Sequence, residues 1–250
     1  CQPMCGAGTL SVAKVLVETG MVKRVEPETK IVLETPTGLV PVYVKWENHM
    51  VASINLENVP AFLYRKDLHI DLAGYGDVSV DIGYGGNFFV LADVHSLGLT
   101  ITKDTVNLLR SLSKDILAAA NKVIKVAHPT NPAINYLDQV LFCQNVPEED
   151  GGYLAQCIFG DAQADISPCG TGTSTRLAQR YFRGLIGLEE TFVQKSVCGG
   201  AFHAKGLRET TLGGVPAIVP YVSCSDVHIT GFNHLIVEEN DKLKNGFVSW

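Results

Sequence analysis

The chain has 250 residues, of which 46% are hydrophobic and 18% charged, and its formal net charge is −6. This composition supports a substantial core and excludes a disordered chain, and the absence of a basic block argues against nucleic acid as a partner. No apolar run approaches the roughly 18 residues that span a bilayer, so we expect no membrane partner.

In chain order, the sequence predicts a helix over 11–17, two strands within 30–44, strands over 61–72 and 78–91, a helix over 103–126, a helix over 177–182, strand character over 191–205, and strands over 217–222 and 228–237. The two short helices end near Gly20 and Gly184, where a glycine is the usual C-terminal signal. Thr102 or Asp104 is expected to cap the long helix. A helix followed by strand, turn and strand occurs twice, which predicts two similar lobes of mixed α/β type.

The same cysteine motif precedes both short helices. It reads Cys5-Gly6-Ala7-Gly8-Thr9 near the start and Cys169-Gly170-Thr171-Gly172-Thr173 far downstream. Small residues let the backbone turn tightly and bring N–H groups close to a ligand. A helix N-terminus favours an anion and the thiolate form of a cysteine. One such element can therefore bind a carboxylate and activate a base.

Two such elements facing each other suit proton transfer at the α-carbon of an amino acid. Inversion of that carbon needs a base on one face, an acid on the other, and a firm grip on the carboxylate. A thiolate and a thiol suit this pair, because each enantiomer requires the opposite protonation pattern. Cys5 and Cys169 are therefore candidates for the two acid/base groups of a racemase or epimerase.

Other interpretations of the cysteines remain open. A buried cysteine is usually a small hydrophobe, and we give that role to Cys143, Cys157, Cys198 and Cys224. The glycine- and threonine-rich motif could instead cradle a phosphate, although it is not a Walker loop, and Arg176 is one residue too far from Cys169 for a cysteine phosphatase. A cysteine hydrolase would need a His and an orienting Asn or Asp, which no local motif supplies. A thiol redox protein is possible, but it would leave the duplicated Gly-Thr context without a use.

The remaining cysteine and histidine pattern bears on metals and on location. The seven cysteines are odd in number with scattered spacing, which indicates reduced thiols and a cytoplasmic protein. There is no CxxC pair and the seven histidines are dispersed, so we expect no metal. The chain begins with Cys1, so we read it as lacking its natural N-terminus, with any signal peptide out of sight.

Asp165 lies four residues before Cys169. An aspartate in this place is commonly a cap or turn residue. Its functional interpretation is that the carboxylate accepts a hydrogen bond from the ammonium or imino group of a substrate.

These residues resemble the proline racemase family, which also contains 4-hydroxyproline epimerases and trans-3-hydroxyproline dehydratases. The segments that carry the resemblance are 4–6, 17–20, 34–40, 58–62, 85–89, 165–173, 190–193 and 244–247. The resemblance covers nearly the whole chain, and the second cysteine motif in its long context is highly specific.

The resemblance implies an α/β (α+β) fold with two pseudo-symmetric lobes of the diaminopimelate-epimerase type. Each lobe has a β-sheet wrapped around a central helix, and the active site lies in the cleft between the lobes. We place the first lobe at 1–64 plus about 226–250, with its N-terminal part missing, and the second at 65–225. Members use no pyridoxal phosphate, no other cofactor and no metal, and they commonly form homodimers.

By resemblance, Cys5 and Cys169 exchange the proton and Asp165 holds the ring nitrogen of an imino acid. The backbone amides of Gly6, Ala7, Gly170 and Thr171 would bind the substrate carboxylate, and Phe159 would lie against the ring.

The sequence departs from the family in three respects. Members usually have His where Ala7 stands, and the loss of the imidazole puts the strength of the activity in doubt. They are also about 80 residues longer at the N-terminus. Finally, Gln139 lies near a position where we expect Cys in proline racemases and His in hydroxyproline epimerases. Gln139 settles neither assignment, and a polar residue leans slightly toward a hydroxylated ring.

The predicted function is therefore inversion of the α-carbon of proline or 4-hydroxyproline without a cofactor. Two alternatives remain. The chain could be a dehydratase-like enzyme of trans-3-hydroxyproline, although a cysteine rather than a threonine at position 169 makes that less favoured. It could also be a catalytically silent paralogue that still binds an imino acid, for which Ala7 and the missing N-terminus are the arguments.

Overall fold

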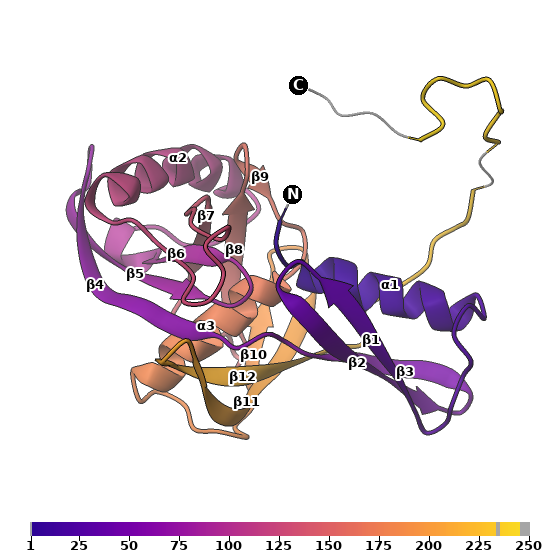
Figure 1. Cartoon of the computed structure of the whole chain (residues 1–250). Coiled ribbons are helices and arrows are strands. Elements are labelled where there is room, and N and C mark those ends of the chain that lie inside the picture. Colours follow the sequence, from indigo (N-terminus) through magenta and orange to yellow (C-terminus); the bar gives the residue numbers. More distant parts are fainter. Residues whose placement is uncertain (1, 234–235, 246–250) are drawn as a thin grey trace.

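The computed structural model describes residues 2–233 and 236–245, and these form the mixed α/β fold that the sequence predicts (Figure 1). The helices are α1 (Gly6–Glu18), η1 (His95–Leu97, a 3-10 helix), α2 (Val106–Val123) and α3 (Gly170–Phe182). None of the helices in these residues is long and apolar enough to cross a membrane.

Twelve strands form one continuous sheet among the described residues. They are β1 (Glu28–Thr35), β2 (Gly38–Glu47), β3 (Met50–Glu57), β4 (Phe62–Leu72), β5 (Gly76–Tyr84), β6 (Phe88–Asp93), β7 (Gln139–Cys143), β8 (Tyr153–Phe159), β9 (Gln163–Ala164), β10 (Phe192–Lys195), β11 (Ala201–Leu212) and β12 (Val215–Cys224). The order is β1-β2-β3-β12-β11-β10-β8-β7-β6-β5-β4, and β9 pairs with β8. Neighbours are antiparallel except for the pairs β6–β7 and β8–β10.

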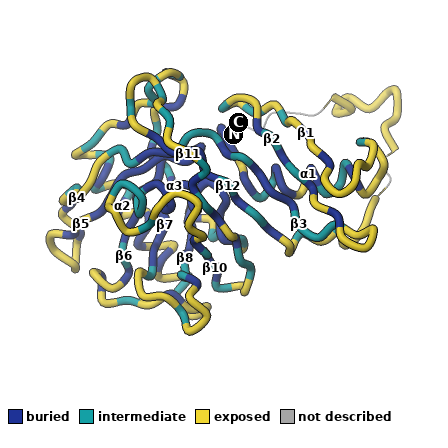
Figure 2. The backbone as a smooth tube through the Cα atoms, turned by 90° about the horizontal axis from the view of Figure 1, so that it is seen from below, coloured by how far each residue is buried: buried dark blue, intermediate teal, exposed yellow. Residues whose placement is uncertain are grey.

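The sheet curls so that each cysteine-led helix packs on a different part of it. Helix α1 contacts β2 and β3, whereas α3 contacts β4, β5, β11 and β12 and lies in the middle of the molecule (Figure 1). The first nine residues of α3 are all buried, while α1 buries five of its thirteen (Figure 2). Pairing of β12 with β3 joins the part of the sheet under α1 to the part around α3. The lobe boundaries, 1–64 with about 226–250 and 65–225, stay a prediction.

The core follows this division. One buried cluster gathers β4–β8 side chains under α2, including Phe62, Phe88 and Phe142. A second cluster joins α1 and β1–β3 to the inner face of α3 and β10–β12, including Leu10 and Leu177. The α2 face that packs on the first cluster carries Leu109, Leu112 and Ile116, a helical spacing that the sequence had made visible.

Three details differ from the sequence-based expectation. Both short helices begin five to seven residues earlier than predicted, at Gly6 and Gly170, because a cysteine caps each start and outweighs the weak helix propensity of Gly and Thr. The N-cap of α2 is Thr105, not Thr102 or Asp104, and its side chain makes no capping hydrogen bond. Strands β3, β7, β8 and β9 were not predicted.

The strand expected over 228–237 was wrong for the described residues of that segment. Residues 228–233 and 236–237 have no strand structure, and residues 234–235 lie outside the described part. The apolar side chains remain exposed, with Ile236 at 90% and Phe232 at 67%. An alternating apolar pattern forms a strand only where a neighbouring strand supplies hydrogen bonds. None of the described strands pairs with the described residues of this segment.

Candidate functional site

Each cysteine of the duplicated motif caps the start of a helix. Cys5 precedes α1, and its Sγ accepts a hydrogen bond from the Gly8 N–H at 3.3 Å. Cys169 precedes α3, and its Sγ accepts from the Gly172 N–H, also at 3.3 Å. A thiol thus takes the capping role that Ser or Asp usually fills, and it lies in the positive field of the helix N-terminus.

The two helix starts meet backbone to backbone. A Cβ placed on Gly6 would lie 2.7 Å from the Cα of Gly170, and a Cβ on Gly170 would lie 2.8 Å from the Cα of Gly6. No side chain fits between these two positions, which explains a glycine after each cysteine. The contact brings two segments that are far apart in the sequence into one pocket.

That pocket has a volume of about 140 Å³ and brings together all eight predicted site residues. They are Cys5, Gly6, Ala7, Phe159, Asp165, Cys169, Gly170 and Thr171. The pocket is also lined by residues that the prediction did not assign to it, namely Gln2, Met4, Asn87 and Cys157, and by Gln139.

The pocket contains four backbone N–H groups without an acceptor. Gly6, Ala7, Gly170 and Thr171 are the first two residues of the two helices, and their amides donate no hydrogen bond within the described part of the chain. The first amides of a helix have no partner inside it, and here both helix dipoles point at one place. This arrangement favours a carboxylate-sized anion between the two cysteines.

Asp165 lies beside Cys169 at the pocket wall. It follows β9, and its Oδ1 accepts a hydrogen bond from the Ser167 N–H at 2.8 Å. Burial raises the pKa of this carboxyl, and hydrogen bonds from Ser167 and Cys169 only partly offset the increase. Next along the chain, the Ser167 Oγ accepts from the Cys169 N–H at 3.0 Å and holds the cysteine in place.

Asn87 ties the two cysteine motifs together. It lies in the turn between β5 and β6, and its Nδ2 donates to the Met4 carbonyl at 2.8 Å and to the Thr171 hydroxyl at 3.3 Å. Gly85 packs on α3, since a Cβ there would lie 2.5 Å from the Thr171 carbonyl. The Gly-Gly-Asn segment was visible in the sequence, but nothing in it alone indicated a role at the site.

Cys157 is the second residue that sequence reasoning missed. Apolar neighbours had suggested a structural thiol, and it is indeed buried on β8. Its thiol nevertheless faces the pocket, and contact with Cys169, together with burial, raises its pKa well above the ordinary value. Phe159 lies two residues further along β8 and packs against the buried cluster that contains Phe89, Leu91 and Cys169.

A polar pair closes another side of the pocket. Gln139 donates through Nε2 to Gln2 Oε1 at 2.8 Å, and Gln2 donates to Asp138 Oδ2 at 3.3 Å. Burial raises the pKa of Asp138, and the hydrogen bonds from Gln2 and Gln139 oppose that increase. Gln139 therefore lines the pocket, and the hydrogen bond to Gln2 orients its amide.

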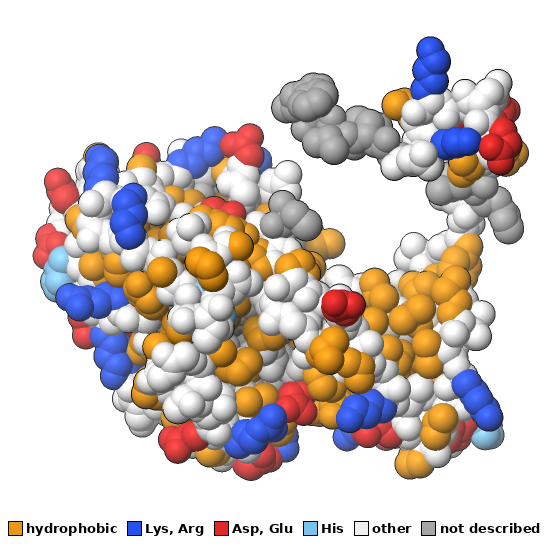
Figure 3. Space-filling model, in the orientation of Figure 1, with side chains coloured by type: hydrophobic (Ala, Val, Ile, Leu, Met, Phe, Trp, Pro, Cys, Tyr) orange, Lys and Arg blue, Asp and Glu red, His pale blue; other side chains and the backbone are white. Residues whose placement is uncertain are grey.

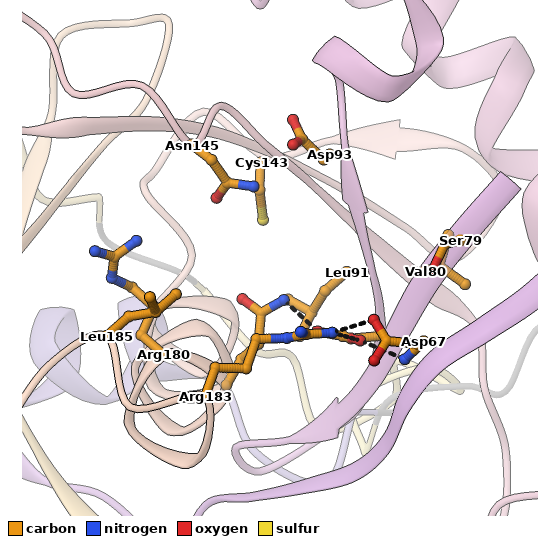
Figure 4. A pocket seen from close by; sticks show the side chains of 12 residues that line it. Asp67, Ser79, Val80, Leu91, Asp93, Cys143, Asn145, Arg180, Arg183 and Leu185 are labelled. Carbon is orange, nitrogen blue, oxygen red and sulfur yellow. Dashed lines mark hydrogen bonds and ion pairs between the residues drawn. The ribbon is translucent and has the colours of Figure 1, made fainter.

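A larger cavity of about 440 Å³ lies at the other end of α3, away from the duplicated motif (Figure 4). Arg183 lines this cavity and forms ion pairs with Asp67 and Asp81. Burial raises the pKa of Asp81, but hydrogen bonds from Arg183 and Gln179 outweigh it and hold the pKa below its usual range. These charges satisfy one another, so the smaller pocket remains the functional candidate.

Arg176 also argues against a phosphate-binding loop. It is fully buried, and its guanidinium donates to the carbonyl oxygens of Leu154 and Gln144 at 3.1 and 2.7 Å. Arg176 therefore satisfies buried backbone carbonyl groups, and it does not line the pocket that contains Cys169.

The fold and the pocket together define a class of protein in which two cysteine-capped helices converge on one small pocket. The family model described as proline racemase matches residues 1–248, and the chain belongs to this family. It is 39% identical over 245 residues to the proline racemase of Acetoanaerobium sticklandii. The matched region covers 98% of this chain and 73% of that protein. It is 37% identical to the trans-3-hydroxy-L-proline dehydratase of Burkholderia cenocepacia, over 98% of this chain and 72% of the other.

Solved structures agree with this assignment. A hydroxyproline epimerase from Agrobacterium vitis, with bound trans-4-OH-L-proline, matches with a TM-score of 0.88 and 31% identity, over 99% of this chain and 71% of the other. The predicted family and fold are thereby confirmed. The roles of the individual pocket residues stay predictions.

Proposed function

We propose that this protein is a racemase or epimerase that inverts the α-carbon of proline or 4-hydroxyproline without a cofactor. One observation carries the proposal: two cysteine-capped helix starts meet at Gly6 and Gly170 in a pocket that Asp165 also lines. Relatives named proline racemase and hydroxyproline epimerase support the same chemistry.

In the proposed reaction the two cysteines act in opposite protonation states. The thiolate of one removes the α-proton, and the thiol of the other delivers a proton to the opposite face of the same carbon. One proton leaves the substrate and one returns, so the product differs only in configuration. The enzyme ends with the two states exchanged, ready for the other enantiomer.

Substrate binding follows from the groups around the cysteines. The four free amides of Gly6, Ala7, Gly170 and Thr171 hold the carboxylate and stabilise the charge that develops on it as the α-proton leaves. The Asp165 carboxylate accepts a hydrogen bond from the ring nitrogen, and Phe159 packs on the ring. We assign Gln139 and Gln2 to the side of the pocket that would meet a ring hydroxyl, as the fixed Gln139 amide supports.

Proton NMR in D2O with L-proline and trans-4-hydroxy-L-proline tests this proposal. We expect loss of the α-proton signal and appearance of the opposite configuration at that carbon. Cys5→Ser and Cys169→Ser should each slow the conversion by about 10³-fold or more, since the removal of an acid/base group costs this much. Cys198→Ser, which replaces an exposed thiol outside the pocket, is the matched control.

Two further measurements separate the alternatives, namely NMR with trans-3-hydroxy-L-proline as substrate and calorimetry with pyrrole-2-carboxylate. A dehydratase would release water from trans-3-hydroxy-L-proline, an activity that the relatives of that name support. A silent paralogue would bind pyrrole-2-carboxylate, a flat mimic of the deprotonated ring, in calorimetry but exchange no α-proton. Full exchange by Cys169→Ser would contradict the two-cysteine mechanism itself.

We further propose that the protein is a homodimer and cytoplasmic. Exposed hydrophobic side chains gather over the part that holds α1 and β1–β3 (Figure 3), and Leu39, Met50 and Val32 are at least half exposed. Such a surface is typical of an interface. All cysteines of the described residues are free thiols, which supports a reducing compartment. Light scattering in solution tests the dimer, and fractionation of cells tests the location.

A further inference from the structure

A third thiol lies in the pocket, and the proposed reaction does not use it. The Cys157 Sγ, the Cys169 Sγ and a carboxylate oxygen of Asp165 all lie within 4.8 Å of one another. Cys157 is 2% exposed and Cys169 is 6% exposed. This is the one group of three or more such ligand atoms in residues 2–233 and 236–245, and the Cys5 side of the pocket has no counterpart.

The backbone holds these three residues in place. The short pairing of β9 with β8 folds the chain back, so that the Asp165 N–H donates to the Cys157 carbonyl at 3.0 Å. Ser167 then links Asp165 to Cys169, because its N–H donates to Asp165 Oδ1 and its Oγ accepts from the Cys169 N–H. All three ligands thus come from one segment, 157–169, with internal hydrogen bonds that define its shape.

The chemistry of this group suits a borderline or soft divalent cation. Two thiolates and one carboxylate are ligands that Zn²⁺ accepts, and a site with three protein ligands leaves a fourth position open. Around a tetrahedral zinc with bonds of about 2.0 to 2.3 Å, ligand atoms lie roughly 3.3 to 3.8 Å apart. The observed limit of 4.8 Å therefore requires only small side-chain movements, and all three residues line the pocket.

We propose that Cys157, Asp165 and Cys169 form an inhibitory binding site for Zn²⁺ or a cation of similar softness, such as Cd²⁺. A cation bound to the Cys169 thiolate withdraws charge from the sulfur, so that it no longer acts as the base for the α-proton, and the cation also occupies the carboxylate that would hold the ring nitrogen. Metal binding stands on the geometry alone, whereas inhibition rests on the proposed function. The metal is an inhibitor here and takes no part in the reaction.

Cobalt provides a test that does not depend on activity. We expect Co²⁺ added to the full chain under reducing conditions to give a thiolate-to-cobalt charge-transfer absorption and the intense visible bands of a tetrahedral site. Cys157→Ser should abolish the charge-transfer contribution of one thiolate and weaken binding at least about tenfold, and Asp165→Asn should also weaken it. Cys143→Ser, at a buried thiol outside the pocket, should bind like the parent.

Zinc inhibition of α-proton exchange is the second readout, with each variant compared with its own rate without metal. We expect Cys157→Ser to raise the half-inhibitory Zn²⁺ concentration at least about tenfold. Cys143→Ser should have the same half-inhibitory concentration as the parent. Absence of a charge-transfer band, or equal cobalt binding by folded Cys157→Ser, overturns the metal site. A band that depends on Cys157 in a chain without any exchange supports the metal site and contradicts the proposed function instead.

Discussion

The two halves of the pocket are built on the same local structure but lie in different surroundings. In both, a cysteine Sγ accepts an N–H from the residue three positions later at 3.3 Å, and a glycine follows the cysteine. Cys5 has an ordinary extended backbone, with φ of −133°, and is exposed. Cys169 has φ of 64°, a conformation that is costly for a residue other than glycine, and is buried.

The surroundings explain this difference. The Cys169 N–H is held by Ser167, its thiol lies against Thr171 and Cys157, and α3 is enclosed by strands. At the first motif, Ala7 occupies the place of Thr171 and supplies no polar side chain. A repeated motif therefore fixes the cap and the free amides, while the packing around each helix decides how closely the thiol is controlled.

Beyond replacement of the cysteines themselves, the largest predicted effect follows from the contact that the two halves of the pocket share. Gly6→Ala places a Cβ 2.7 Å from the Gly170 Cα, so the two helix starts must separate. Displacement of reacting groups by about 1 Å costs roughly 100-fold in rate, and we expect at least that loss of α-proton exchange. Gly170→Ala should have a similar effect, because its Cβ meets the Gly6 Cα at 2.8 Å.

NMR exchange rates and thermal unfolding together check this prediction. Gly231→Ala is the control, since a Cβ there meets nothing within 4 Å. Both pocket variants should also lower the free energy of unfolding by about 1 to 3 kcal/mol, the usual cost of overpacking. Wild-type exchange by Gly6→Ala would show that the helix starts do not act as one unit.

The next largest effect is expected only in the half of the pocket that contains Cys169. Asp165→Asn removes the carboxylate assigned to the ring nitrogen, and we expect KM to rise roughly 100-fold, as for a charge-assisted hydrogen bond of about 2 to 3 kcal/mol. Asp161→Asn, at an exposed carboxylate four residues earlier, should leave KM unchanged. An unaltered KM in Asp165→Asn would show that the carboxylate does not bind the substrate and that Asp165 only stabilises the turn, where it accepts from the Ser167 N–H.

The pH dependence sharpens the same prediction. Burial raises the pKa of Asp165, so its carboxylate forms at higher pH than that of an ordinary aspartate, and on acidification kcat/KM should fall at a higher pH than an ordinary aspartate would give. Because the folded pKa lies above the unfolded one, the folded state binds more protons in this window, and the contribution of Asp165 to stability falls as the pH rises through it. Asp165→Asn should therefore lose activity at neutral pH without loss of thermal stability.

Much of this site was visible in the sequence, for a physical reason. Capping, glycine contacts and helix starts are local, so the duplicated motif predicted Cys5 and Cys169 and their amides. Cys157 and Asn87 were missed because their roles depend on contacts across the fold: Asn87 reaches Met4, and β9 folds Asp165 back onto Cys157. The same limit applies to the fold, where β7 and β8 are buried strands without an alternating pattern.

The smallest predicted effect tests whether the surroundings of the two thiols matter. Thr171→Ala removes the hydroxyl that lies 3.7 Å from the Cys169 Sγ and accepts from Asn87 at 3.3 Å. We expect kcat to fall about fivefold to tenfold, since one neutral hydrogen bond contributes about 1 kcal/mol.

Thr171→Ser keeps the hydroxyl and should retain most of the activity, which separates the hydrogen bond from packing. The reciprocal change, Ala7→Thr, gives the first motif the residue of the second, and it should change kcat less than Thr171→Ala does, because Cys5 is exposed and water already reaches its thiol. If Ala7→Thr raises kcat as much as Thr171→Ala lowers it, the two halves are equally sensitive. The asymmetry inferred from burial would then have no part in the reaction rate.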